Sequence, residues 1–261
     1  MLSILIPTYN YNITTLVKRL HIEATSLHIN FEILVREDAS EKYIFENSEI
    51  EKLTNVTYSK NSENIGRSAT RKALAEATSF DTLLFLDADV FPFYENFIKN
   101  YIENPETQVI CGGITYTGVL PKENEQLRFV YGSKKEQQTA AQRTKRNYII
   151  TAGNFRIKRA LFIEINTRLD NFYGDDLLLS QKLKQKEATV LQIDNPVKHL
   201  GLETSQQFLD KSLKGVTSLF EMEREGLLEN DFTRLQCLYL KLKKLDCLPR
   251  LLNFFPTEKI K

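Results

Sequence analysis

The stretch Leu83-Leu84-Phe85-Leu86-Asp87-Ala88-Asp89-Val90 is an apolar run that carries two carboxylates one residue apart. The run predicts a buried central strand. Because side chains at positions i and i+2 of a strand lie on one face, we expect Asp87 and Asp89 to converge just beyond the sheet. Buried carboxylates are costly without a positive partner, and Mg²⁺ or Mn²⁺ favours such oxygen ligands. The stretch therefore indicates either a divalent-metal site or two solvated aspartates in a turn.

The segments before this strand alternate between strand and helix patterns. Short apolar runs predict strands at residues 2–6, 31–36 and 56–59. We expect Pro7 to end the first of them. Helix-forming residues predict helices at 14–27 and 67–77. The alternation predicts an α/β fold with a mostly parallel central sheet flanked by helices.

Polar side chains follow each of these predicted strands. Tyr9, Asp38, Asn64 and Asp89 lie in the four loops concerned. Ligands of parallel sheets bind outside the carboxyl ends of the strands. We therefore expect the four loops to direct polar groups at one crevice.

The second half of the chain is less regular. In the predicted strand at 109–116, the pair Gly112 and Gly113 indicates a bend or a close backbone approach. Residues 118–147 are polar and basic, which is typical of solvated surface or of a mobile loop that closes over a site. The remaining patterns predict strands at residues 151–157 and 190–193 and helices at 95–101, 158–163 and 177–183.

Composition limits the class of protein. The chain has 261 residues and a formal net charge of +1, and its basic residues are spread out, so nothing favours nucleic acid as a partner. Three cysteines, Cys111, Cys237 and Cys247, have no metal-ligand spacing and suit a reducing compartment. The first apolar run is too short for a signal peptide, and no stretch approaches the roughly 18 apolar residues of a membrane span. We expect a cytoplasmic protein.

The C-terminal part, residues 205–261, predicts helices. Residues 239–245 alternate between apolar side chains and lysines, and a further apolar group follows Pro249: Leu251, Leu252, Phe254 and Phe255. Such a basic, apolar tail could lie on an anionic membrane at its inner face, as a peripheral contact. The alternative is that it packs against the main domain.

Six short motifs occur in order along the chain: Ile6-Pro7-Thr8-Tyr9-Asn10, Glu37-Asp38-Ala39-Ser40, Asn64-Ile65-Gly66 followed by Arg71, Asp87-Ala88-Asp89, Gly153-Asn154-Phe155 and Gly174-Asp175-Asp176. Together they resemble the inverting family 2 glycosyltransferases, which have the type-A nucleotide-sugar-binding fold. The resemblance runs from residue 2 to about residue 200. The sequence departs from the family pattern at three positions: Ala39, where Gly is frequent, Lys72, where Asn is usual, and Asp175, where Glu is common.

The resemblance implies a nucleotide site in the first half. The loop of Pro7, Thr8 and Tyr9 would pack against the nucleoside. Asp38 would accept a hydrogen bond from the base, usually uracil. The residues that would line the nucleotide pocket are Asn64, Gly66 and Arg71, with Arg71 near the diphosphate.

The same resemblance implies roles around the metal and the acceptor. Asp89 would bind Mn²⁺ or Mg²⁺ directly, and Asp87 would contact the ribose, or the metal through water. Gly153 and Asn154 would border the donor sugar and the acceptor. Asp176 would be the catalytic base, with the adjacent Asp175 raising its proton affinity, although capping of a helix N-terminus is the alternative role for this acidic pair. His199 is either a further metal ligand or phosphate contact, or a structural histidine.

The resemblance also implies the domain organisation and the reaction. Residues 1–204 would form the catalytic domain, with a nucleotide-binding half at 1–90 and a donor-sugar and acceptor half at 91–204. Residues 205–261 would be a helical extension. The reaction would be metal-dependent, inverting transfer of a sugar, from a UDP-sugar in particular, to a carbohydrate or glycolipid acceptor of bacterial polysaccharide or glycolipid synthesis.

Two other functions stay open. A nucleotidyltransferase would also use an Asp-x-Asp site, although the chain lacks an obvious Gly-rich, basic phosphate loop near its start. A non-catalytic sugar-nucleotide-binding or assembly protein could retain the fold without turnover.

Overall fold

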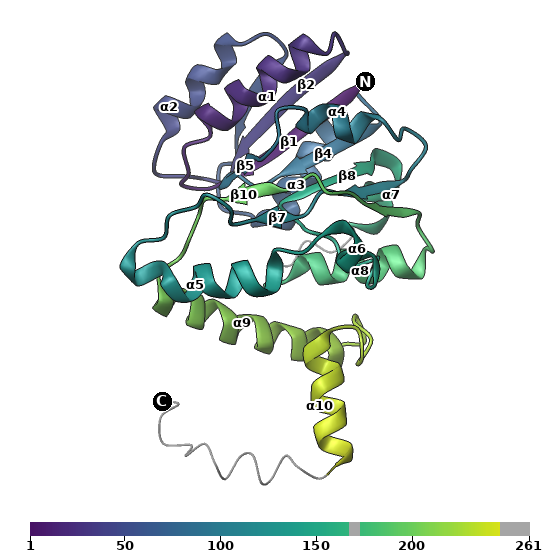
Figure 1. Cartoon of the computed structure of the whole chain (residues 1–261). Helices are drawn as coiled ribbons and strands as arrows, with labels where there is room; N and C mark the ends of the chain where they lie inside the picture. The colour runs from purple at the N-terminus through teal and green to yellow at the C-terminus, as the bar shows by residue number, and fades with distance from the viewer. Residues whose placement is uncertain (167–172, 246–261) are drawn as a thin grey trace. The chain divides into compact units, whose positions relative to one another are not determined.

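The computed structural model of the chain describes residues 1–166 and 173–245. The chain divides into two compact units, residues 1–215 and 216–261. The first unit is built around a seven-stranded sheet in the order β3-β2-β1-β4-β8-β6-β9 (Figure 1). Its strands are β1 (Leu2–Thr8), β2 (Phe31–Glu37), β3 (Val56–Lys60), β4 (Thr82–Leu86), β6 (Val109–Cys111), β8 (Asn154–Lys158) and β9 (Val190–Gln192).

The sheet is mostly parallel, as the sequence predicts. β1 lies between β2 and β4 and runs parallel to both, β3 runs parallel to β2, and β9 runs parallel to β6. The exception is β8, which is antiparallel to its neighbours β4 and β6. The predicted α/β fold with flanking helices is confirmed.

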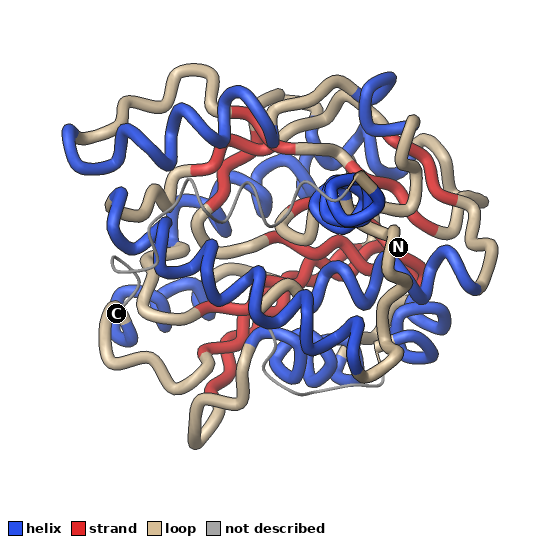
Figure 2. Tube along the Cα trace, turned by 90° about the horizontal axis from the view of Figure 1, so that it is seen from below, coloured by secondary structure: helices blue, strands red, loops and turns tan. Residues whose placement is uncertain are grey.

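Alternation along the strands divides the core between the two faces of the sheet. Ile4 and Ile6 of β1 pack into one cluster with α1 (Thr14–Ser26) and α4 (Phe97–Ile102). Leu5 belongs to the other cluster, which the sheet shares with three helices: α3 (Arg67–Ala77), α7 (Arg159–Ile165) and α8 (Asp175–Gln185). Helices therefore cover both faces (Figure 2). The short α2 (Ile44–Ser48) and η1 (Glu49–Lys52) follow β2.

β1 continues through Pro7 to Thr8, so the prediction that Pro7 ends this strand is wrong. Pro7 pairs with Arg36 of β2, whereas the pairing of β1 with β4 ends at Leu5. A residue without an N–H is tolerated there because the strand has a single neighbour at that position.

A second, three-stranded sheet joins β5 (Val90–Pro92), β10 (Val197–His199) and β7 (Ile114–Thr115). β10 runs antiparallel to β5, with His199 opposite Val90. The predicted strand at 109–116 is thus split into β6 and β7 at Gly112 and Gly113. A Cβ atom at Gly112 would overlap the Tyr101 hydroxyl, which confirms the predicted close approach.

The basic segment after β7 is not an open loop. It forms η2 (Glu123–Glu125), α5 (Gln126–Tyr131), the π-helical turn η3 (Gly132–Glu136) and α6 (Ala140–Thr144). The interpretation of this segment as solvated surface is wrong for Arg143, which is buried. Its guanidinium donates to Oε1 of Gln192, at 2.9 Å, and to the Ile193 carbonyl, at 2.6 Å. These bonds tie the segment to the edge strand β9.

The helices predicted in the C-terminal part are present as far as the description extends. α9 (Ser205–Arg224) begins in the first unit and ends in the second, and α10 (Arg234–Lys244) follows. Thr233 caps α10 by accepting a hydrogen bond from the backbone of Gln236. Cys247, Pro249 and the apolar group at 251–255 lie outside the described residues. Membrane contact by the tail stays a prediction.

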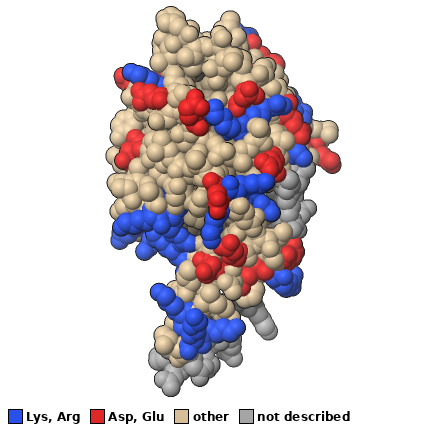
Figure 3. Space-filling view, turned by 90° about the vertical axis from the view of Figure 1, so that its right-hand side faces the viewer, with Lys and Arg blue, Asp and Glu red and all other residues tan. Residues whose placement is uncertain are grey.

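The apolar character of the helices and the distribution of surface charge are two further features of the described residues. In the described ranges, no helix combines the length and the apolar character needed to cross a membrane. On the face shown in Figure 3, acidic and basic side chains lie together across the middle, and a separate group of basic side chains lies at the lower left.

Candidate active site

Two adjoining cavities lie where the loops after β1, β2 and β4 meet the loops of the second half. The larger has a volume of about 630 Å³ and the smaller about 400 Å³. They adjoin because four residues line both: Arg67, Asp87, Asp89 and Lys211. The predicted residues that line the smaller cavity are Pro7, Thr8, Tyr9, Asp38, Asn64, Gly66, Asp87 and Asp89. Those that line the larger are Asp87, Asp89, Gly153, Asp175, Asp176 and His199.

Asp38 organises the wall of the smaller cavity. Its Oδ1 accepts hydrogen bonds from the Asn61 side chain and the Ile65 backbone, both at 2.9 Å. Its Oδ2 accepts one from the Gly66 backbone, also at 2.9 Å. These bonds hold a buried carboxylate and leave Oδ2 able to accept a further bond. Tyr9, a residue that is 55% exposed, adds an aromatic side chain to the wall of the same cavity.

Ala39, where family members often have Gly, adopts a left-handed conformation with φ of 58°. This conformation costs a residue with a Cβ about 1–2 kcal/mol. Hydrogen bonds in the loop must offset this cost. The backbone of this loop is therefore held by contacts: the Ser40 hydroxyl accepts a hydrogen bond from the backbone of Asn10, at 2.8 Å.

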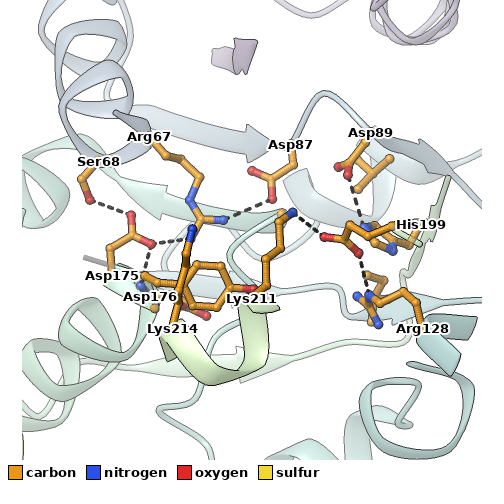
Figure 4. Close-up of a pocket in the computed structure, with 16 residues that line it drawn as sticks. Arg67, Ser68, Asp87, Asp89, Arg128, Asp175, Asp176, His199, Lys211 and Lys214 are labelled. Atoms are coloured by element: carbon orange, nitrogen blue, oxygen red, sulfur yellow. Dashed lines mark hydrogen bonds and ion pairs between the residues drawn. The ribbon is translucent and has the colours of Figure 1, made fainter. Parts of the chain in front are cut away.

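Asp87 and Asp89 lie in the turn between β4 and β5, beyond the last strand residue, Leu86. The prediction that a strand places them on one face is therefore wrong, although both face the larger cavity (Figure 4). Asp87 is held by Arg71, whose Nη2 lies 2.6 Å from Oδ1. Asp89 instead faces His199, with 3.3 Å between Oδ2 and Nε2.

Two glycines make room for these carboxylates. A Cβ atom at Gly153 would come within 2.8 Å of Oδ2 of Asp87, and one at Gly201 would overlap Oδ2 of Asp89. Gly153 precedes β8 and Gly201 follows β10, so both approach from the second half of the chain. The positions of the two aspartates thus depend on segments distant in sequence.

In the described part of the chain, two of the predicted site residues line neither of the two cavities: Arg71 and Asn154. Besides Asp87, Arg71 donates to the Ala152 carbonyl, at 2.8 Å, and its side chain is only 4% exposed. The amide of Asn154, which is fully buried, accepts from Tyr101 at 2.6 Å. It donates to the carbonyls of Gly113 and Asn195 at 2.8 and 3.0 Å. The structure places both side chains behind the cavity wall.

Asp175 and Asp176 occupy the first turn of α8, where the helix dipole favours negative charge. Gly174, with φ of 90°, turns the chain into this helix. Asp175 forms an ion pair with Arg67 and accepts a hydrogen bond from Ser68 Oγ at 2.7 Å. The two carboxylates therefore have different surroundings, although they are adjacent.

The two carboxylates differ accordingly in proton affinity. Burial raises the pKa of Asp176, against the attraction of Arg67, and the charge of Asp175 raises it further. Burial acts in the same direction on Asp175, but the Arg67 and Arg71 guanidiniums and the Ser68 hydrogen bond hold its pKa below the ordinary value. A pair with one ionised member and one of raised proton affinity is suited to accepting a proton.

Several charged residues of the larger cavity were not identified from the sequence: Arg67, Arg128, Glu203, Lys211 and Lys214. Glu203 joins Arg128 of α5, at 3.1 Å, to Lys211 of α9, at 2.5 Å. Arg67 directly follows the Asn64-Ile65-Gly66 motif, which is a signal that could have identified it. No local signal identifies the others, because α5 and α9 bring Arg128, Lys211 and Lys214 to the site and Glu203 lies in the segment between β10 and α9.

The donor atoms of Asp89 and His199 suit a divalent cation. A carboxylate oxygen and an imidazole nitrogen converge at 3.3 Å, and Gly201 leaves space for the carboxylate. In the part of the chain that the structure describes, no cluster of three or more His, Cys, Asp or Glu side chains forms a complete set of ligands. Mg²⁺ and Mn²⁺ commonly take the rest from substrate phosphates and water. The residues present therefore fit such an ion in combination with a diphosphate.

Several solved structures are similar in fold to this chain. Similar solved structures include S. aureus TarS 1-349 in complex with UDP-GlcNAc, which is 17% identical (TM-score 0.55, covering 88% of this chain and 71% of that chain). The mannosyltransferase PcManGT from Pyrobaculum calidifontis, in complex with GDP-Man and Mn²⁺, is 12% identical (TM-score 0.55, 95% and 80%). Mannosyl-3-phosphoglycerate synthase from Rubrobacter xylanophilus is 14% identical (TM-score 0.60, 88% and 76%). At these identities the likeness shows a shared fold.

Sequence comparison identifies the family. A comparison with curated proteins gave no match. The family model described as Glycosyl transferase family 2 matches residues 3–165, which is more than half of the 261 residues. The resemblance to family 2 is thus confirmed over the first five motifs, whereas Gly174-Asp175-Asp176 lies beyond the matched residues. The chain belongs to glycosyl transferase family 2, whose members are enzymes that transfer a sugar from a nucleotide-sugar donor.

Proposed function

We propose that the protein is a metal-dependent, inverting glycosyltransferase that uses a UDP-sugar donor. One observation carries the proposal: the pair Asp89 and His199 and the pair Asp175 and Asp176 line one cavity, which adjoins a second cavity lined by Tyr9 and Asp38. The arrangement offers a place for a nucleoside, for a diphosphate and for a sugar next to a base, in that order.

The smaller cavity suits the nucleoside. Tyr9 offers an exposed ring against which a base can stack, and Oδ2 of Asp38 can accept one more hydrogen bond. Uracil has an N–H that would donate this bond. Among the similar structures, one binds UDP-GlcNAc and another GDP-Man, so the base is to be tested on this chain directly.

The diphosphate would lie where the cavities adjoin, beside Arg67 and Lys211. Asp89 and His199 would hold Mn²⁺ or Mg²⁺ there, and the bound ion would stabilise the negative charge that develops on the departing diphosphate. Asp87, whose charge Arg71 already balances, would face the ribose.

Asp176 would act as the catalytic base. It would accept the proton of the acceptor hydroxyl while the hydroxyl oxygen attacks the anomeric carbon and the bond to the diphosphate breaks. Attack on the face opposite the leaving group inverts the configuration of that carbon. The raised pKa of Asp176 makes it a stronger base than an ordinary aspartate. Asp175 would stay ionised beside it.

The acceptor is proposed to be a carbohydrate or glycolipid hydroxyl, in the synthesis of a bacterial polysaccharide or glycolipid. It would enter the larger cavity, where Tyr173 and Lys214 form part of the wall next to Asp176. This part of the proposal rests on the family and on the position of the base.

A thermal-shift screen of nucleotide sugars, with and without Mn²⁺, tests the proposal. We expect one UDP-sugar to raise the melting temperature in the presence of Mn²⁺ and to lose this effect in excess chelator. Binding of nucleoside triphosphates with release of pyrophosphate would instead support a nucleotidyltransferase. A protein that binds the sugar nucleotide but never hydrolyses or transfers the sugar would be a non-catalytic binder.

A further inference from the structure

Arg67 links the two ends of the site. It is the first residue of α3 and lines both cavities. Its guanidinium forms an ion pair with Asp175 through Nη2, and its Nη1 lies 3.8 Å from Oδ2 of Asp87. Figure 4 shows Arg67 lying between these two carboxylates. One side chain therefore reaches both the donor side and the acidic pair of α8.

Arg67 and Arg71 differ in their freedom to move. The Arg71 side chain is 4% exposed and donates to both Asp87 and a backbone carbonyl, so it is fixed in the wall. The Arg67 side chain is 43% exposed. Because Arg71 already balances the charge of Asp87, Arg67 can turn to another anion without leaving Asp87 unpaired.

Asp175 also keeps partners when Arg67 leaves. Ser68 Oγ donates to its Oδ2 at 2.7 Å, and the backbone of Asp176 donates to its Oδ1 at 3.1 Å. The Arg67 side chain of this ion pair is 43% exposed, whereas the Asp175 side chain is only 10% exposed. A diphosphate carries more negative charge than one carboxylate, and it can accept bidentate hydrogen bonds from a guanidinium. A bound diphosphate can therefore draw Arg67 away from Asp175, which keeps its two other hydrogen bonds.

We propose that Arg67 is shared between Asp175 and the donor diphosphate, holding the carboxylate in the free enzyme and contacting the diphosphate in the donor complex. The inference rests on the proposed function, which places the diphosphate where the two cavities adjoin. Asp175 and the donor then compete for one guanidinium. It follows that removing Asp175, a residue of the catalytic pair, strengthens donor binding.

A double-mutant cycle tests this competition. UDP binding in the presence of Mn²⁺ is measured by calorimetry for the wild type, Arg67→Met, Asp175→Asn and the double variant. We expect Arg67→Met to bind UDP about tenfold more weakly, as for loss of a charged hydrogen bond. Asp175→Asn should bind at least about fivefold more tightly, the low end of the usual coupling between two binding events, because Arg67 no longer has a carboxylate to leave. The double variant should bind like Arg67→Met alone.

Two controls separate this effect from a general change of charge. Glu164→Gln removes one negative charge at an ion pair with Lys186 outside both cavities, and it should leave UDP affinity near the wild-type value. Uridine has no phosphate, so all four proteins of the cycle should bind it equally. Tighter binding by Asp175→Asn that persists without Arg67, or that Glu164→Gln matches, would overturn the proposal.

The result also separates this inference from the proposed function. GDP is tested in parallel with UDP. If the wild type binds neither diphosphate with Mn²⁺, the proposed function fails and the inference with it. If UDP binds and folded Arg67→Met, checked by circular dichroism, binds it as tightly as the wild type, only the inference fails. Arg67→Lys keeps the positive charge but lacks the planar guanidinium that forms bidentate hydrogen bonds. Its UDP affinity should lie between those of the wild type and Arg67→Met.

Discussion

His199 Nε2 lies 3.3 Å from Oδ2 of Asp89, and the pairing of β10 with β5 places His199 opposite Val90, the residue after Asp89. If this pair holds the metal, His199→Ala removes one of two protein ligands. We expect at least about tenfold weaker binding of Mn²⁺ in the presence of UDP, the low end of the effect of changes around metal ligands. Titration with Mn²⁺ at fixed UDP, followed by electron paramagnetic resonance, measures it.

His21→Ala provides the matched control. His21 lies on α1, and its Nε2 contacts the Thr54 carbonyl at 3.0 Å. It lines neither cavity, so its removal should leave Mn²⁺ affinity unchanged. Equal affinities of the His199 variant and the wild type would contradict the assignment of His199 to the metal.

Gly201 sets the position of the Asp89 carboxylate. A Cβ atom at this position would overlap Oδ2, Cβ and Cγ of Asp89, so Gly201→Ala must displace that side chain. We expect the variant to lose Mn²⁺-dependent UDP binding nearly as far as Asp89→Ala does, while uridine binding is retained. Calorimetric titration with both ligands gives the comparison. A Gly201→Ala protein that binds UDP and Mn²⁺ normally would show that Asp89 has no metal role in this conformation.

The raised pKa of Asp176 makes the stability of the folded protein depend on pH. Because its pKa is raised in the folded state, the folded protein holds this proton more tightly than the unfolded chain does. Protonated Asp176 therefore stabilises the folded state at pH values below the ordinary aspartate pKa. This contribution is lost as the pH rises through the raised pKa of the folded state. Asp176→Asn should abolish sugar transfer, spare donor binding and unfold at higher denaturant concentration than the wild type at pH 8. The difference in stability should vanish near pH 3. Near-normal turnover would refute the role of the base.

The charge of Asp175 should appear in the pH dependence of transfer. Its pKa is lowered, so it is ionised at neutral pH, and its negative charge raises the pKa of Asp176. Asp175→Asn removes this charge. We therefore expect the acidic limb of the pH profile of kcat to move to lower pH in the variant, measured as donor turnover with the identified UDP-sugar. A shift to higher pH would contradict this electrostatic arrangement.

Asn154 is expected to act on stability rather than on ligands. Its amide joins Tyr101, Gly113 and Asn195 inside the protein. Asn154→Ala would leave buried carbonyls and a hydroxyl without these partners, at a cost of about 2–4 kcal/mol in free energy of unfolding. Urea denaturation measures it. A variant of wild-type stability with impaired donor or acceptor binding would instead favour the role that the family resemblance implied.

The sequence predicted the elements whose signals are local. The helix at 67–77 and the apolar runs of β1, β2 and β4 were identified because their residues have strong propensities and regular burial. The direction of β8, antiparallel between β4 and β6, could not be read from its own residues. Strand order depends on contacts between segments far apart in the chain, and a local pattern does not contain them.

The same distinction applies to the candidate site. Residues in loops directly after strands, such as Asp38 and Asp89, were expected at the crevice and line it. Arg128 and Lys211 were not foreseen, because α5 and α9 bring them to the cavity from positions where a single basic residue is typical of a solvated surface. Arg71 was expected near the ligand, but its burial became visible only with Asp87 and Ala152 around it.

The small sheet of β5, β10 and β7 connects the proposed metal pair with the excursion at residues 116–147. Pairing over residues 90–92 and 197–199 places Asp89 against His199, whereas residues 116–147 leave the sheet after β7 and bring Arg128 to the larger cavity. Arg128 binds Glu203, which also binds Lys211. A graft that replaced the interior of this excursion would therefore keep the short ladder but remove one end of that chain of charges, so a redesigned excursion has to retain Arg128.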